Sequence, residues 1–70
     1  MQTIGASIRA KRKSIDVKEG ELAKGLGVSS NTISRWEHDE SYPSLMNVIA
    51  LADFFECSVD ELLGRKELTE

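Results

Sequence analysis

The sequence predicts an all-α domain built from five short helices, and three observations support this. Apolar residues recur at three- and four-residue spacing along the 70-residue chain, and no segment alternates strictly as a half-buried strand would. Glycine and proline are sparse, with five and one residues, and a hydrophobic fraction of 40% is normal for a globular chain. The helical segments are joined by short connections, as in compact helical domains of low contact order.

The first helix is predicted over about residues 2–13. Ile4 and Ile8 lie four residues apart on one face, and four cations crowd the last turns: Arg9, Lys11, Arg12 and Lys13. Cations at this end complement the helix dipole, and they are equally suited to contact phosphate. The residues alone leave both interpretations open.

The second helix is predicted over about 18–25. We expect Asp16 to cap it, with Glu19 completing a reciprocal cap. Gly27 lies where a helix ends in a left-handed turn, which glycine adopts without strain. The apolar side is formed by Leu22, Ala23 and Leu26.

The third helix starts at Ser29, a good N-cap, and runs to about His38. Ile33 and Trp36 are three residues apart and are predicted to face the core, so Trp36 is a core residue. His38 is predicted to be a solvated residue at the helix end. The residues left facing outward are Ser30, Asn31, Ser34 and Arg35.

The fourth helix is predicted to begin at Ser44, directly after Pro43, and a fifth helix begins at Ser58. The predicted apolar stripe of the fourth helix is Leu45, Val48, Ile49, Ala52 and Phe55. Ser58 and Glu61 form a predicted capping box before Leu62 and Leu63. Gly64 ends that helix, so we expect a domain over 1–64 and a polar tail over 65–70.

Composition excludes several functions. One cysteine, Cys57, allows no internal disulfide and fits a reducing cytoplasm. Cys57 and His38 are the only soft metal ligands and lie far apart, so we expect no metal and no cofactor. No apolar run reaches membrane-spanning length. No pairing of nucleophile and base and no phosphate loop is present, so we expect no enzyme.

Charge is unevenly distributed along a chain of net charge −3. Residues 1–37 carry seven Lys or Arg against four Asp or Glu, a net +3, whereas residues 38–70 carry two against eight, a net −6. A domain can present one positive face and still be acidic overall, and the face decides what it binds.

Residues 22–36 have the layout of a helix-turn-helix, in which the second helix projects into the DNA major groove. Gly27 provides the tight turn, and Ala23 is small where the two helices approach closely. Ile33 and Trp36 face the common core. This spacing is set by packing, so its joint occurrence is informative.

The chain resembles lambda repressor-like domains of the Cro/CI or XRE type. The matching stretches are "IGASIRAKRK", "ELAKGLGVSSNTISRWE", "YPSLMNVIALADFF" and "SVDELLG", which together span residues 4 to 64. The resemblance implies a compact five-helix fold and sequence-specific binding of double-stranded DNA by a prokaryotic or phage transcriptional regulator, a repressor. It also implies a cytoplasmic homodimer on a palindromic operator. The last helix, with Val59, Leu62 and Leu63, is a candidate dimer surface.

The resemblance also implies roles for individual residues. Ser30, Asn31 and Arg35 fall on positions that reach base edges, where Asn can pair with adenine and Arg with guanine. Four residues are expected to contact the DNA backbone: Arg12, Lys18, Thr32 and Ser34. Ser30 and Asn31 could instead satisfy free N–H groups of the first helical turn. Arg12 is expected to pair with Glu37, which as a mere surface pair would contribute under about 1 kcal/mol.

The sequence departs from this family where phosphate contacts would form. Lys18 and Glu19 replace the usual Ser and Gln, and Glu19 would repel a phosphate. Asp39 must take over a turn usually made by glycine, and Glu56 occupies a helix-ending glycine position. Fewer phosphate contacts predict weaker, salt-sensitive DNA binding. They also keep open an alternative, a protein-interaction module on the same fold, antitoxin-like or anti-repressor.

Overall fold

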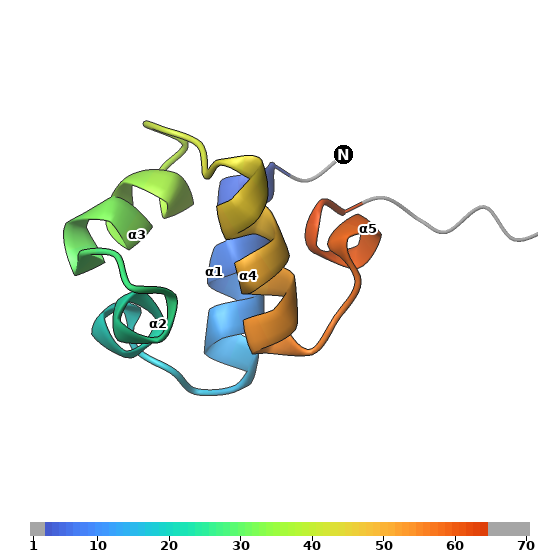
Figure 1. The fold of residues 1–70 in the computed structure, drawn as a ribbon, viewed down its shortest axis with the longest axis horizontal. Coiled ribbons are helices and arrows are strands. Elements are labelled where there is room, and N and C mark those ends of the chain that lie inside the picture. The colour runs from blue at the N-terminus through green and yellow to red at the C-terminus, as the bar shows by residue number, and fades with distance from the viewer. Residues whose placement is uncertain (1–2, 65–70) are drawn as a thin grey trace, which may run out of the picture.

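The computed structural model describes residues 3–64, and these form five helices and no strand. Figure 1 shows the helices α1 (Ile4–Ser14), α2 (Glu19–Leu26), α3 (Ser30–Glu37), α4 (Leu45–Phe55) and α5 (Val59–Leu62). The predicted all-α fold and the predicted order of helices are confirmed. The proposed tail over 65–70 lies outside the described residues. None of the helices within residues 3–64 is long and apolar enough to cross a membrane.

Serine and threonine hydroxyls begin four of the helices by accepting a backbone N–H from the first turn. Ser29 accepts from Thr32, as predicted, and Ser44 begins α4, also as predicted. Ser58 caps α5, but the second half of its predicted capping box is replaced by another contact. The carboxylate of Glu61 pairs with Lys11 of α1 at 3.2 Å, so it ties α5 to α1.

The predicted cap of α2 was wrong. Asp16 has a φ of +58° and lies in the turn between α1 and α2, whereas an N-cap needs an extended backbone. Lys18 is the N-cap, and its N–H donates to Oε1 of Glu21 at 2.9 Å. The chain turns from α1 to α2 within four residues here, and aspartate tolerates the left-handed conformation that it adopts in this turn.

The core lies between the five helices, and each of them contributes buried hydrophobic residues. Trp36 is only 3% exposed, and Ile33 and Ile8 are fully buried, which confirms their predicted inward direction. The buried hydrophobic residues are Ile8, Leu22, Ala23, Ile33, Trp36, Val48, Leu51, Ala52 and Leu62.

The predicted stripe of α4 was partly wrong. Leu45 is 72% exposed and Ile49 is 40% exposed, whereas Leu51, which was not in the stripe, is fully buried. The inward face follows Val48, Leu51 and Ala52, as helical spacing allows. Almost every residue of this helix is apolar, so hydrophobic spacing alone did not identify the buried face.

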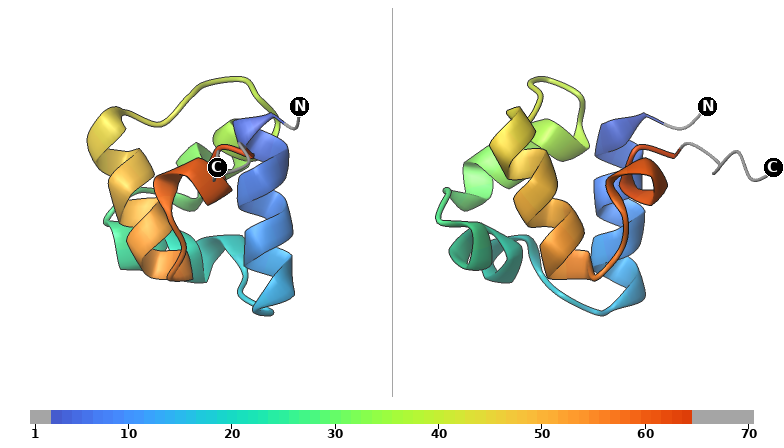
Figure 2. Two further views of the ribbon diagram at one scale, coloured as in Figure 1. Left: turned by 90° about the vertical axis from the view of Figure 1, so that its right-hand side faces the viewer. Right: turned by 45° about the vertical axis from the view of Figure 1, so that its right-hand side comes forward.

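The helices α2 and α3 lie together on one side of the molecule. Figure 1 shows α2 and α3 on the left and α5 on the right, with α1 and α4 between them. The turned views in Figure 2 show that α5 lies against α1 and α4 and away from α3. The outer surface of α3 is therefore not covered by any other described helix.

Candidate nucleic-acid interface

Backbone hydrogen bonds and a left-handed glycine define the turn between α2 and α3. Gly27 ends α2 with a φ of +75°, and the N–H of Val28 donates to the carbonyl of Ala23 at 3.0 Å. Ala23 is buried in the core, and its small side chain permits close packing there. Ser29 then starts α3 at once, so the orientation of α3 on α2 is determined by a turn of three residues. The predicted helix-turn-helix layout is confirmed.

One face of α3 is buried in the core and the other is exposed to solvent. Ile33 and Trp36 anchor the inner face in the core. The outer face carries the three side chains for which base contacts were predicted, and all three are exposed: Ser30, Asn31 and Arg35. The structure therefore directs these side chains to solvent, and their contact with bases stays a prediction.

The first turn of α3 is capped by Ser29. The orphan N–H of Thr32 is already satisfied by Oγ of Ser29 at 3.1 Å. Within residues 3–64 the side chains of Ser30 and Asn31 make no hydrogen bond to the protein. The alternative that these two residues serve as local caps is thus not what the structure shows.

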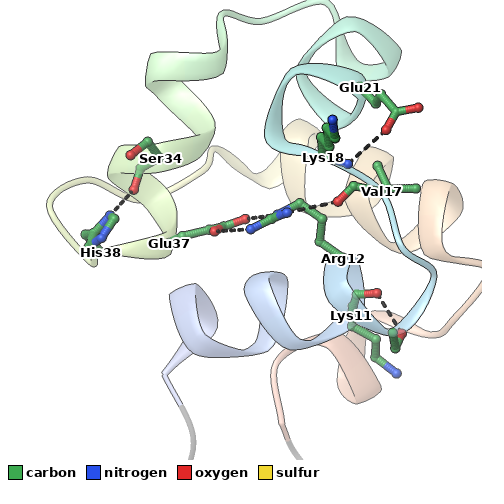
Figure 3. Close-up of polar contacts among 9 residues, drawn as sticks. Lys11, Arg12, Val17, Lys18, Glu21, Ser34, Glu37 and His38 are labelled. Carbon is green, nitrogen blue, oxygen red and sulfur yellow. Dashed lines mark hydrogen bonds and ion pairs between the residues drawn. The ribbon is translucent and has the colours of Figure 1, made fainter.

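Thr32 and Ser34 flank this outer face and are half-exposed. The hydroxyl of Thr32 lies 2.9 Å from Oγ of Ser29, so it is oriented by the cap. The carbonyl of Ser34 lies 2.8 Å from Nδ1 of His38, as Figure 3 shows. His38 is exposed at the C-terminal end of α3, as predicted.

Arg12 and Glu37 form a buried ion pair that fixes α1 against α3. Nε of Arg12 lies 2.6 Å from Oε2 of Glu37, and Nη2 lies 3.0 Å from Oε1, a two-pronged contact visible in Figure 3. Nη1 donates to the carbonyl of Val17 at 2.9 Å. The side chains are 12% and 1% exposed, so the alternative of a surface pair is wrong.

This pair determines what Arg12 can do. Its hydrogen bond to Glu37 raises the pKa of Arg12, against the opposing effect of burial. All three guanidinium nitrogens are already bonded within the protein. Arg12 therefore acts in this structure by positioning α3, and its predicted contact with the DNA backbone remains untested.

A second contact, between α1 and the turn that follows α3, was not predicted from sequence. Asp39 has a φ of +59°, which confirms that it takes the left-handed turn, and its Oδ1 accepts the N–H of Gly5 at 3.3 Å. A Cβ on Gly5 would collide with the carbonyl of Trp36, so only glycine permits this approach. The available signal was a glycine in the first turn of a helix, which is otherwise unfavourable.

Two of the cations near this site form ion pairs within the protein, and a third is exposed. Lys11 turns to Glu61 of α5, and Arg12 turns to Glu37 of α3. Lys18 is exposed at the N-terminal end of α2, beside the half-exposed Glu19. The free positive charge nearest the start of α2 is thus partly offset by a carboxylate.

The fold and the exposed face of α3 together define a helix-turn-helix domain. The sequence model described as helix-turn-helix matches residues 8–62, and the chain belongs to this family. It is 42% identical over 62 residues to repressor protein C2 of Salmonella phage P22, covering 89% of this chain and 29% of that protein. It is 39% identical over 56 residues to the transcriptional regulator DicA of Escherichia coli, covering 80% of this chain and 42% of that protein.

Solved structures show the same fold. The P22 c2 repressor in complex with a synthetic operator superimposes with a TM-score of 0.86 at 39% identity, covering 94% of this chain and 100% of that one. The biofilm regulator SinR in complex with DNA superimposes with a TM-score of 0.80 at 29% identity, covering 87% and 98%. The chain spans only 29% to 48% of the length of three curated relatives that it matches.

Proposed function

We propose that this chain is the sequence-reading domain of a transcriptional regulator and that α3 enters the major groove of double-stranded DNA. The observation that carries the proposal is the division of α3 into a buried anchor, Ile33 and Trp36, and a free polar face. The relatives named as regulators and the neighbours solved with operator or DNA support it. They favour DNA binding over a protein-interaction module on the same fold.

The outer face supplies the groups that base edges recognise. Arg35 matches the two acceptors of guanine, and Asn31 matches the donor and acceptor of adenine. Ser30 can donate to or accept from either base. Because these side chains make no hydrogen bond or ion pair with residues 3–64, they break none when they bind.

Sequence-independent affinity comes from different residues. Lys18 offers a charge to the phosphates, and Thr32 and Ser34 offer hydroxyls beside them. Glu19 and the exposed Glu40 repel phosphate, so we expect affinity to be modest even at low salt and to fall with salt only through the phosphate contacts that remain.

The domain acts without catalysis, in the cytoplasm, as one half of a homodimer on a palindromic operator. One small domain contacts few bases, and twofold symmetry doubles these contacts along one face of the duplex. We propose repression, because it requires only that the operator be occupied. Curated relatives include the P22 repressor and the activator BcrR of Enterococcus faecalis, which is 36% identical over 53 residues.

Selection of duplexes from a random library, followed by binding titrations, tests the proposal. Arg35→Ala should flatten the preference between selected and unselected duplexes by roughly 10- to 100-fold, the worth of a bidentate base contact. Lys18→Ala should weaken all duplexes alike and reduce the log–log salt slope by about 1. Failure to enrich any duplex at low salt, or the same pattern for both variants, contradicts the proposed function.

A further inference from the structure

The first turn of α1 is capped in part by a residue that follows α3. Oγ of Thr3 accepts the N–H of Ala6 at 3.1 Å, and this is the local cap. Oδ1 of Asp39 accepts the N–H of Gly5 at 3.3 Å. The first turn of α1 contains no acidic residue of its own, and a carboxylate at this end of a helix is stabilised by the helix dipole. The dipole of α1 therefore partly compensates the charge of Asp39.

The backbone around Asp39 connects this contact to Arg35. The N–H of Asp39 donates to the carbonyl of Trp36 at 3.1 Å. The N–H of Glu40 donates to the carbonyl of Arg35 at 2.9 Å. This pair of bonds is the Schellman arrangement, and it requires the left-handed backbone that Asp39 adopts, with a φ of +59°. A displacement of Asp39 is thus transmitted to the last turn of α3, from which Arg35 projects.

The backbone of α1 is the surface on which the end of α3 rests. A Cβ at Gly5 would collide with the carbonyl of Trp36 and lie 2.6 Å from Oδ1 of Asp39. Gly5 and Arg12 are two turns apart on α1, about 10 Å along the helix axis. Arg12 forms the other contact, its ion pair with Glu37. Two contacts this far apart fix the rotation of α3 against α1, whereas one contact leaves that rotation freer.

We propose that Asp39 is a positioning residue for base recognition: its carboxylate, held at the N-terminal end of α1, orients the last turn of α3 so that Arg35 reaches its base. The inference rests on the proposed function and adds a residue that does not itself touch DNA. Glycine, the usual residue of this turn, would make the turn without the anchor. Orientation matters because a bidentate contact with guanine depends on the direction of the guanidinium as well as on its distance.

A carboxylate near a DNA surface has a simpler alternative role, repulsion of phosphate. Repulsion predicts that removing the charge strengthens binding to every duplex alike. Positioning predicts weaker binding to the preferred duplex and unchanged binding to the others, because Lys18 lies on α2 and does not move with the end of α3. The structure favours positioning, since Asp39 is half-buried and bonded whereas Glu40 is exposed.

The test uses Asp39→Gly, because glycine keeps the left-handed turn and removes the carboxylate. Binding is titrated on a duplex with one selected half-site and on the same duplex with that half-site scrambled, at two salt concentrations. A single half-site keeps contacts between copies out of the measurement. The preference for the selected half-site should fall about 5- to 10-fold, the lower part of the usual range of coupling between sites. Affinity for the scrambled duplex and its salt slope should stay unchanged.

Three further variants separate positioning from other effects. Asp39→Asn keeps an acceptor oxygen and tolerates the turn, so it should retain most of the preference. Glu56→Gly is the matched control, because Glu56 is another carboxylate with a positive φ, +55°, directly after a helix. Its side chain makes no hydrogen bond or ion pair within residues 3–64, so the preference should not change. In the Arg35→Ala background, Asp39→Gly should cause no further loss, because the two residues act as a unit.

Four results overturn the inference. They are an unchanged preference in Asp39→Gly, tighter binding of that variant to both duplexes, an equal loss in Asp39→Asn or Glu56→Gly, and a further loss in the Arg35→Ala background. A wild-type protein that binds selected and scrambled half-sites equally would instead refute the proposed function itself.

Discussion

Arg12→Met is expected to lower the free energy of unfolding by about 3 kcal/mol, because it leaves the carboxylate of Glu37 buried without its partner. Glu37 is 1% exposed, and both of its oxygens are bonded to Arg12. Removing one member of a buried pair typically costs about 3–5 kcal/mol, and we take the lower end because Arg12 keeps 12% of its side chain in water.

The double variant Arg12→Met/Glu37→Leu should be more stable than Arg12→Met alone. It removes the uncompensated charge and loses chiefly the hydrogen bond to Val17, which is worth about 1 kcal/mol. The assay is urea unfolding of the wild type, both single variants and the double variant, analysed as a double-mutant cycle. A coupling energy of about 2 kcal/mol or more is expected, within the range for contacting residues. Additive effects, or single losses under about 1 kcal/mol as at exposed pairs, would refute the reasoning.

The pH dependence of this coupling has a defined sign. The hydrogen bond to Glu37 raises the pKa of Arg12, so folding favours the charged guanidinium. Its stabilisation is complete below the ordinary pKa of arginine and is lost only as the pH rises through the raised value. The coupling energy measured at pH 10 should therefore equal that at pH 7. A coupling that had decayed by pH 10 would contradict the assigned cause.

Three further predictions concern the scaffold. A Cβ at Gly25 would lie 2.6 Å from the ring of Phe54, whereas a Cβ at Gly20 meets nothing within 4 Å. In urea unfolding, Gly25→Ala should cost about 1–3 kcal/mol and Gly20→Ala should stabilise by about 0.5–1 kcal/mol; equal effects would refute the close approach. Glu56 has a φ of +55°, so Glu56→Gly should raise the melting temperature, and a lower one would argue against strain there. Burial raises the pKa of the Cys57 thiol, so iodoacetamide at pH 8 should modify it more slowly in the folded protein than in urea; equal rates would contradict this.

Local rules in the sequence predicted most of the scaffold. Hydrophobic spacing located the helices, and serine before an apolar run located the starts of α3, α4 and α5. Ile33 and Trp36 were assigned to the core correctly, because α3 alternates clearly between apolar and polar faces. α4 lacks such contrast, and this is why Leu45 and Ile49 were placed inside although they face water.

The contacts that hold α3 in place were harder to predict. The N–H of Gly5 donates to the carboxylate of Asp39. The two residues are 34 positions apart in the sequence, and no local pattern encodes such a pair. The pairing of Arg12 with Glu37 followed from family resemblance, and its burial emerged only when α1 and α3 were packed together. Asp16 had a suitable side chain for a cap, but the turn between α1 and α2 placed its backbone in the left-handed region. Tertiary geometry overrode local preference in each case.

Amide chemical-shift mapping of the labelled protein, titrated with a selected duplex, tests the central claim most directly. If the scaffold presents the outer face of α3 to the major groove, the largest shifts should fall on residues 29–35, with smaller ones at Lys18 and Glu19. The amides of α5 should stay unchanged. Shifts concentrated on α5, or spread evenly without a maximum on α3, would contradict the account.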